Sequence, residues 1–140
     1  MILVINTSGQ EKFTIALSED DGNLISRKIF HSHFTQAEKL LPSIDNFLQL
    51  KKSKLADLSG VVVVKGPGGF TGLRIGVMTA NTLAYALKIP VVGFKIGDFR
   101  DIKDLAKKAS YKLRKTRVGS MVIPFYGREP NITKPKKKLL

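Results

Sequence analysis

The arrangement of residues 60–94 constrains the fold of this chain more than any other feature of its sequence. A predicted buried strand, Gly60–Lys65, in which Val61–Val64 is an unbroken apolar run, leads into a glycine-rich turn and then into a helical repeat from about Thr71 to Leu87. A second short apolar run, Pro90–Phe94, follows directly. Because a strand, a helix and a strand in this order form a right-handed crossover, the two strands are predicted to lie parallel in one sheet.

The N-terminal part of the chain predicts strands joined by tight turns. The runs are Met1–Thr7, Glu11–Ser18 and Leu24–Phe30, and the turns between them contain glycine. Such short connections imply antiparallel neighbours. The first run is apolar almost throughout, which is typical of a strand buried on both faces. The side chains expected to point inward from the other two runs are Phe13, Ile15, Leu17, Leu24 or Ile25, and Ile29.

Two further helices are predicted from apolar residues that recur every three or four positions. The first follows a capping box at Thr35–Glu38 and runs to about Leu50, and the second spans Asp101–Leu113. Met121–Phe125 is predicted to form one more strand or an apolar anchor, and the chain from Pro130 onward to be extended or disordered. These elements predict an α/β fold, a single lobe with a mixed five-stranded sheet and helices packed on it.

The composition excludes several classes of function. The chain has no cysteine, which excludes disulfides, thiolate metal sites and cysteine nucleophiles and fits a reducing cytosol. Neither a signal peptide nor a membrane-length apolar segment is recognisable, so a cytoplasmic protein without membrane contact is expected. Residues 1–98 carry 11 basic and 8 acidic side chains, whereas residues 99–140 carry 13 and 3. The C-terminal part therefore favours polyanionic partners.

The turn at Gly66–Gly72 exposes backbone N–H groups at the start of a helix, an arrangement that can bind anions. It is not a Walker A loop, because no Gly-Lys-Ser/Thr closes it, and Thr71 stands in the last place of G-x-G-x-x-G. Two interpretations remain open: a phosphate-binding turn, or a sharp turn that needs glycine for steric reasons. The candidate phosphate-binding residues are Asn6, Thr7, Ser8, Gly68 and Gly69.

No catalytic or metal site is predicted. His31 and His33 are close in sequence but have no evident third ligand. A paired nucleophile and base is not recognisable either.

The helix after the turn carries a ridge of small residues, Gly72, Gly76, Ala80 and Ala84, spaced four apart. Such a ridge allows another element to approach closely. The preceding helix has more apolar side chains than one sheet is expected to cover, and surplus apolar surface suggests a protein interface. Packing of the ridge within the chain itself is the alternative, which the sequence leaves open.

Segments at residues 2–8, 37–44, 66–76 and 89–93 resemble those of the TsaB (YeaZ-like) family in order and spacing. The most specific is Gly-Pro-Gly-Gly-Phe-Thr-Gly-Leu-Arg-Ile-Gly at residues 66–76, and residues 124–133 resemble the family's ending. The resemblance implies an actin-like (ASKHA), ribonuclease H-like lobe that acts as a non-catalytic subunit in tRNA N6-threonylcarbamoyladenosine synthesis, without a cofactor. Asn6 differs from the actin-like sequence pattern, which usually has an aspartate at this position. An amide is a poorer ligand for magnesium than a carboxylate.

The resemblance also implies a domain organisation and a partner. Residues 1–97 correspond to the lobe, residues 98–120 to a basic helical segment in place of a second lobe, and residues 121–140 to a C-terminal strand and basic tail. The two helices of the lobe are expected to dock on the homologous catalytic subunit, TsaD, or to pair two copies of the chain. The expected partner-binding residues are Leu40, Leu41, Ile44, Phe47, Thr71, Gly72, Leu73, Gly76 and Ala80.

Two other functions remain open. One is a nucleotide-binding relic of the actin-like fold. The other is a basic accessory module that contacts tRNA, although Tyr111 and Tyr126 are the only tyrosines nearby for base stacking. The residues expected to contact nucleic acid are Lys107, Lys108, Lys112, Arg114, Lys115, Lys136, Lys137 and Lys138.

Overall fold

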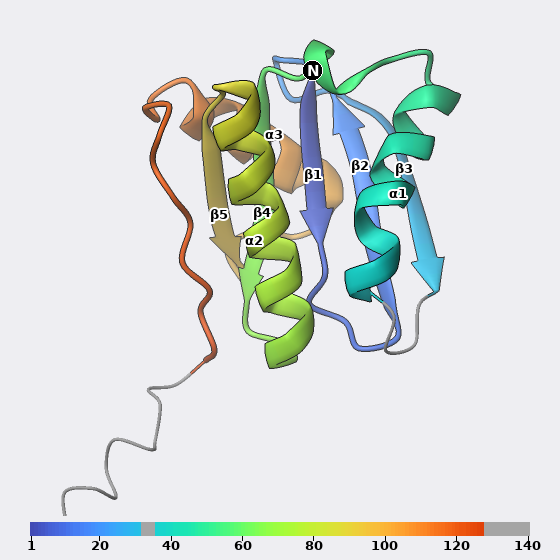
Figure 1. Cartoon of the computed structure of the whole chain (residues 1–140). Coiled ribbons are helices and arrows are strands. Elements are labelled where there is room, and N and C mark those ends of the chain that lie inside the picture. The colour runs from blue at the N-terminus through green and yellow to red at the C-terminus, as the bar shows by residue number, and fades with distance from the viewer. Residues whose placement is uncertain (32–35, 128–140) are drawn as a thin grey trace, which may run out of the picture.

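A computed structural model describes residues 1–31 and 36–127, which form a three-layer α/β lobe (Figure 1). Its five-stranded sheet has the order β3-β2-β1-β4-β5. The strands are β1 Ile2–Asn6, β2 Lys12–Ser18, β3 Leu24–His31, β4 Gly60–Gly66 and β5 Val91–Lys95. The β1–β2 and β2–β3 pairs are antiparallel, and β1–β4 and β4–β5 are parallel. The mixed sheet predicted from the turns and the crossover is therefore confirmed.

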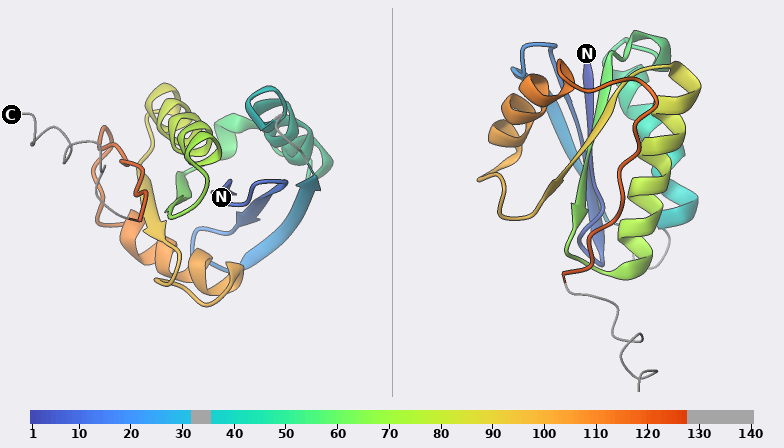
Figure 2. Two further views of the ribbon diagram at one scale, coloured as in Figure 1. Left: turned by 90° about the horizontal axis from the view of Figure 1, so that it is seen from below. Right: turned by 90° about the vertical axis from the view of Figure 1, so that its left-hand side faces the viewer.

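Helices cover both faces of the sheet. Helices α1 Gln36–Leu50 and α2 Phe70–Leu87 lie on one face, and α3 Ile102–Leu113 lies on the other (Figure 2, left). A short 3-10 helix, η1 Leu55–Asp57, follows α1. Thr35, the predicted cap of α1, lies outside the described residues. None of the helices in the described part of the chain is long and apolar enough to cross a membrane.

Strand β1 is buried on both faces, as its continuous apolar run predicted. Leu3 and Ile5 join the core under α1 and α2, whereas Ile2 and Val4 join the core under α3. The alternation follows from the two-residue period of a strand. The inward residues predicted for β2 (Phe13, Ile15 and Leu17) all belong to the first core. Helix α3 is therefore a third layer of the same lobe, packed on the strands through apolar side chains.

Strand β3 departs from its prediction, because Ile29 does not point into a core. Ile25 and Ile29 are 44% and 46% exposed. β3 is one of the two edge strands, and α3 covers the centre of the sheet and not this edge (Figure 2, left). Leu24 and Phe30 are the partly buried apolar residues of β3, and the Phe30 ring stacks on Phe13 with centroids 5.0 Å apart.

Residues 121–125 form the apolar anchor rather than a strand. The Asn81 side chain of α2 donates to the Val122 carbonyl oxygen at 3.0 Å and accepts from the Val122 N–H at 2.9 Å. Val122 is buried against Gly93 of β5, where a Cβ atom would lie 2.5 Å from Val122 Cγ1. The burial of Val122 and its two hydrogen bonds with Asn81 thus fix this segment beside α2.

The ridge of small residues on α2 faces the chain's own sheet, so the prediction that a partner binds at this ridge is wrong and the alternative, packing within the chain, is correct. A Cβ atom on Gly76 would overlap Thr7 Oγ1 at the end of β1. The small residues are needed because α2 packs closely on β1 and β4. Most predicted partner-binding residues are consequently buried within the lobe, namely Leu40, Ile44, Phe47, Gly72, Leu73, Gly76 and Ala80.

Candidate functional site

The glycine turn before α2 is shaped by close contacts between backbone segments. Gly66 has a φ angle of +134°, and a Cβ atom there would overlap the carbonyl oxygen of Phe125. A Cβ atom on Gly68 would lie 2.7 Å from the carbonyl oxygen of Ser8. Both positions require glycine for steric reasons. The geometry favours the steric interpretation of this turn over a phosphate-binding one.

The polar residues at the end of β1 bond to one another and to α2. Thr7 Oγ1 donates to the Gly72 carbonyl oxygen at 2.7 Å. Ser8 donates to Asn6 Oδ1 from its backbone nitrogen at 3.0 Å and from its hydroxyl at 2.6 Å. The structure thus brings the candidate phosphate-binding residues together, with Gly69 as the N-cap residue of α2. The hydrogen bond from Thr7 holds the end of β1 against α2, and Gly68 lies in close contact with Ser8.

The described residues do not gather a metal-binding donor set. His31 is exposed at the end of β3, and His33 lies outside the described residues. Within residues 1–31 and 36–127, no three His, Asp or Glu side chains lie where they could share a metal ion. The Asn6 amide oxygen already accepts two hydrogen bonds from Ser8. An amide so engaged is a poor ligand for a hard cation.

The outward face of α2 is almost free of charge and partly apolar. Phe70, Met78 and Tyr85 are 55%, 66% and 82% exposed. Arg74 is the only charged residue among the 18 of this helix. A surface helix normally carries charged residues opposite its buried stripe. A helix that lacks them and exposes large apolar side chains marks a site of contact with another molecule.

The anchored C-terminal segment extends this apolar surface. It runs beside α2 in Figure 2 (right), and a groove of about 510 Å³ lies between them. Met121 and Ile123 are 73% and 75% exposed along the groove. Tyr126 also lines the groove, and the centroids of the Phe70 and Tyr126 rings lie 4.4 Å apart. We give the name α2 patch to five of the exposed large side chains of the two segments: Phe70, Met78, Tyr85, Met121 and Ile123.

Helix α1 contributes less to the exposed apolar surface. Leu41 is half exposed, whereas Asp45 and Gln49 on the outside of α1 are hydrogen-bonded to each other at 3.0 Å. Of the partner-binding residues predicted from sequence, Leu41 and Thr71 are the two at the surface. Sequence reasoning missed the α2 patch. The sequence did contain a pattern that indicates this patch: the uncharged residues Thr71, Met78, Thr82 and Tyr85 recur at helical spacing opposite the small ridge.

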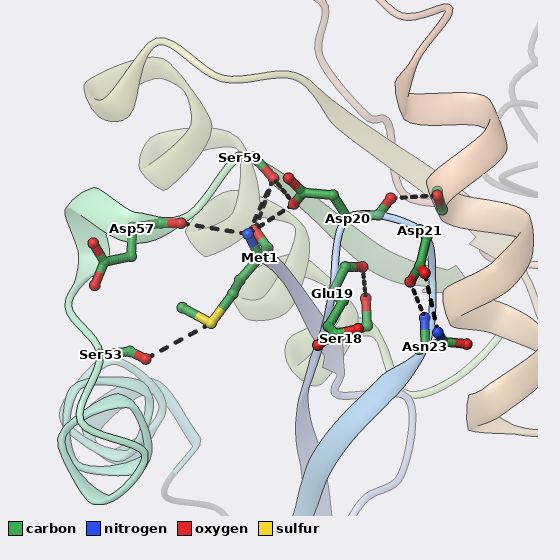
Figure 3. Close-up of polar contacts among 10 residues, drawn as sticks. Met1, Ser18, Glu19, Asp20, Asp21, Asn23, Ser53, Asp57 and Ser59 are labelled. Carbon is green, nitrogen blue, oxygen red and sulfur yellow. Dashed lines mark hydrogen bonds and ion pairs between the residues drawn. The ribbon is translucent and has the colours of Figure 1, made fainter.

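A polar cluster ties the amino terminus to neighbouring segments (Figure 3). The Met1 ammonium donates to Asp20 Oδ1 at 2.8 Å, and the Ser59 hydroxyl donates to the same oxygen at 2.6 Å. The Ser110 hydroxyl of α3 donates to the Asp20 carbonyl oxygen at 2.6 Å. The hydrogen bonds from the amino terminus and then from Ser59 lower the pKa of the Asp20 carboxyl group.

This cluster predicts a pH-dependent contribution to stability. Since the pKa of Asp20 is lower in the folded chain, its contribution is complete above the unfolded value of 3.8 and is lost as the pH falls through the folded value. The Asp20 side chain is 72% exposed. Replacing Asp20 with asparagine is therefore expected to lower the free energy of unfolding at neutral pH by only about 0.5 kcal/mol, as for other exposed ion pairs.

Urea unfolding between about pH 2 and pH 7 measures this contribution. Destabilisation by Asp20→Asn is expected to shrink toward zero at the acidic end. Glu19→Gln is the control, because it removes a carboxylate of the same turn that takes no part in the cluster. A destabilisation by Asp20→Asn that is equal at every pH would contradict the assignment.

The basic residues predicted to contact nucleic acid fall into two groups. Those on α3 or just after it are exposed: Lys107, Lys108, Lys112, Arg114 and Lys115. The others, Lys136, Lys137 and Lys138, lie outside the described residues. Phe94 and Tyr111 lie among the α3 lysines and line a shallow cavity of about 500 Å³ with them.

Comparisons with known proteins identify relatives of the chain. Residues 31–96 match the family model described as TsaD, tRNA N6-adenosine threonylcarbamoyltransferase. The tRNA threonylcarbamoyladenosine biosynthesis protein TsaB of Bacillus subtilis is 38% identical over 90 residues, 64% of this chain and 38% of the relative. Its namesake in Escherichia coli is 32% identical over 92 residues, 66% of this chain and 38% of the relative. The solved structure of YeaZ from Pseudomonas aeruginosa superimposes with a TM-score of 0.61 at 28% identity, covering 67% of this chain and 43% of that one.

The sheet order, the helices on both faces and the structural match define a one-lobe α/β protein of the actin-like class. Within that class, the chain belongs to the TsaB (YeaZ-like) family. It spans well under half the length of the relatives named above. What those relatives do as whole proteins is therefore a matter of proposal for this chain.

Proposed function

We propose that this chain is a non-catalytic subunit for cytoplasmic synthesis of threonylcarbamoyladenosine in tRNA, and that it docks on a TsaD-type catalytic subunit through the outer faces of α1 and α2. The observation that carries the proposal is the α2 patch, which leaves Met78 and Tyr85 in water on a helix with a single charged residue. The TsaB relatives are named for this biosynthesis.

The family match suggests what kind of surface the partner offers. The TsaD model matches residues 31–96, which include α1, β4 and α2. A TsaD-type subunit therefore has segments equivalent to the two helices. Pairing of related helices gives an approximately two-fold contact, in which each side offers the same apolar face. For the same reason, two copies of this chain are proposed to pair through the α2 patch when the catalytic subunit is absent.

The end of β1 supports a non-catalytic role. In the actin-like pattern an aspartate stands at this place, and here it is Asn6, whose amide oxygen is engaged by Ser8. The neighbouring hydroxyl of Thr7 donates to the backbone of α2. These side chains contribute to packing between β1 and α2. The reacting groups and any cofactor are proposed to belong to the catalytic subunit.

Reconstitution tests this proposal. The purified chain is mixed with the TsaD-type subunit of the same organism, and complex formation is followed by size-exclusion chromatography with light scattering. Threonylcarbamoyl transfer to tRNA is measured for each protein alone and for the mixture, with the remaining components of the pathway supplied. We expect a heteromeric complex, no transfer by this chain alone and faster transfer by the mixture. Transfer by the chain alone would contradict the proposal, as would a mixture without a complex.

A further inference from the structure

We infer that the outer face of α3 binds RNA at unpaired nucleotides, with lysine ammonium groups contacting phosphates and Tyr111 stacking on a base. This α3 face consists of Lys107, Lys108, Tyr111, Lys112 and Lys115 together with Phe94 of β5. It lies on the opposite side of the sheet from the α2 patch (Figure 2, left). The inference is therefore independent of the proposed docking, and both faces can be occupied at the same time.

The positive charge on this face is largely uncompensated. Between residues 105 and 127 the sequence has six basic residues and no acidic one. Lys108 pairs with Asp104 at 3.2 Å, whereas the Lys107 ammonium donates to the neutral side chain of Asn23 at 2.8 Å. Within residues 1–31 and 36–127, neither Lys112 nor Lys115 has a carboxylate within ion-pair distance. Such ammonium groups attract phosphates in a salt-dependent manner.

Aromatic rings stand between these charges. Tyr111 is 58% exposed. The Lys115 ammonium lies 4.1 Å from the centroid of its ring and donates to its hydroxyl oxygen at 2.6 Å. The Lys112 ammonium lies 5.0 Å from the centroid of the Phe94 ring. An exposed ring with cations beside it matches the way in which proteins hold single-stranded RNA, where bases stack on the rings and phosphates lie against basic side chains.

An anionic membrane surface is the other polyanion that a basic helix could bind. Helices that lie on membranes insert their apolar face among the lipids. The aliphatic residues of α3 are Ile102, Leu105, Ala106, Ala109 and Leu113; Ile102 is partly buried against the sheet and the other four are buried. This helix therefore has no apolar face free for insertion. RNA, which needs only the exposed lysines and a ring, is the better fit.

Fluorescence anisotropy with the full-length chain tests the inference. The probes are a fluorescein-labelled RNA stem-loop with an unpaired loop and a fully paired RNA duplex of equal length. Tyr111→Ala is expected to weaken stem-loop binding about tenfold, whereas Tyr111→Phe keeps the ring and is expected to bind within about twofold of the original chain. Circular dichroism confirms that each variant is folded.

The charge test uses Lys112→Ala/Lys115→Ala, with Lys12→Ala/Lys51→Ala as a matched control that removes the same charge elsewhere on the surface. The first pair is expected to reduce the slope of log affinity against log salt by about 1.4, because each phosphate contact on a single strand contributes about 0.7. The control is expected to change the slope by much less. The lysines at positions 134–138 are present in every variant, so the difference reports on the α3 face.

Three results would overturn the inference. The first is equal binding of the stem-loop and the duplex with no effect of Tyr111→Ala. The second is an equal change of slope in the two lysine pairs. The third is sedimentation with phosphatidylserine vesicles that the α3 variants abolish, while RNA binding stays unchanged in the same variants.

Discussion

Replacing Gly76 with alanine is expected to lower the free energy of unfolding by about 2 kcal/mol, and replacing it with leucine is expected to prevent folding of the lobe. A Cβ atom at this position would overlap Thr7 Oγ1 and lie 3.1 Å from Thr7 Cβ, so β1 and α2 would have to separate. Overpacking costs about 1–3 kcal/mol, the hydrogen bond from Thr7 to Gly72 contributes about 1 kcal/mol, and alanine returns about 1 kcal/mol of helix propensity.

Urea unfolding followed by circular dichroism measures this effect. Ala86→Leu is the matched control, because Ala86 is exposed on the same helix and a larger side chain there is expected to change stability by less than about 0.5 kcal/mol. In a Thr7→Ala background, Gly76→Ala is expected to cost less than it does in the original chain, because the two side chains are in contact. A stably folded Gly76→Leu variant would show that the small-residue ridge is open to solvent after all.

Replacing Met78 with glutamate is expected to weaken docking on a TsaD-type subunit by 100-fold or more. Met78 is 66% exposed, so the substitution is expected to leave the stability of the lobe nearly unchanged. In the proposed complex the same carboxylate would be buried without a partner, and an uncompensated buried charge costs about 3–5 kcal/mol. Isothermal titration calorimetry with the purified subunits measures the loss of affinity.

Ile29→Glu is the matched control for this variant. Ile29 is a half-exposed apolar residue on β3, an edge strand that is separated by β2 from the strands on which α2 packs. The Ile29→Glu variant loses an apolar side chain similar to Met78 and gains the same charge, so general electrostatic effects are equal in the two variants. We expect it to bind the subunit like the original chain. Equal affinities of the Met78 and Ile29 variants would exclude the outer face of α2 from the interface.

The strands and helices could be predicted from the sequence because each one has either a periodic pattern or an unbroken apolar run. The unbroken apolar run of β1 indicated a central strand buried on both faces, and the glycine turn before α2 indicated a crossover. The predicted burial of Ile29 was wrong. Alternation predicts only which residues share a face of β3. It does not predict whether a helix covers that face at the edge of the sheet.

The candidate site was harder to predict for a similar reason. A ridge such as Gly76 and Ala80 permits close packing, and it has the same spacing whether a sheet or a partner helix covers it. Only the structure shows that Thr7 and the neighbouring strands fill the space next to it. The C-terminal part of the α2 patch could not be predicted, because the hydrogen bonds between Asn81 and Val122 join residues 41 positions apart.

The absence of cysteine allows the most direct test of the proposed docking face. A single thiol is introduced by Met78→Cys or, as the control, by Ile29→Cys, and its rate of reaction with a maleimide is measured with and without the TsaD-type subunit. Both side chains are exposed in a single copy of the chain, so both thiols are expected to react readily at a concentration where light scattering shows the lone chain to be monomeric. We predict that the catalytic subunit protects the thiol at position 78 and leaves the one at position 29 reactive. A complex in which the thiol at position 78 reacts as fast as in the free chain would contradict it.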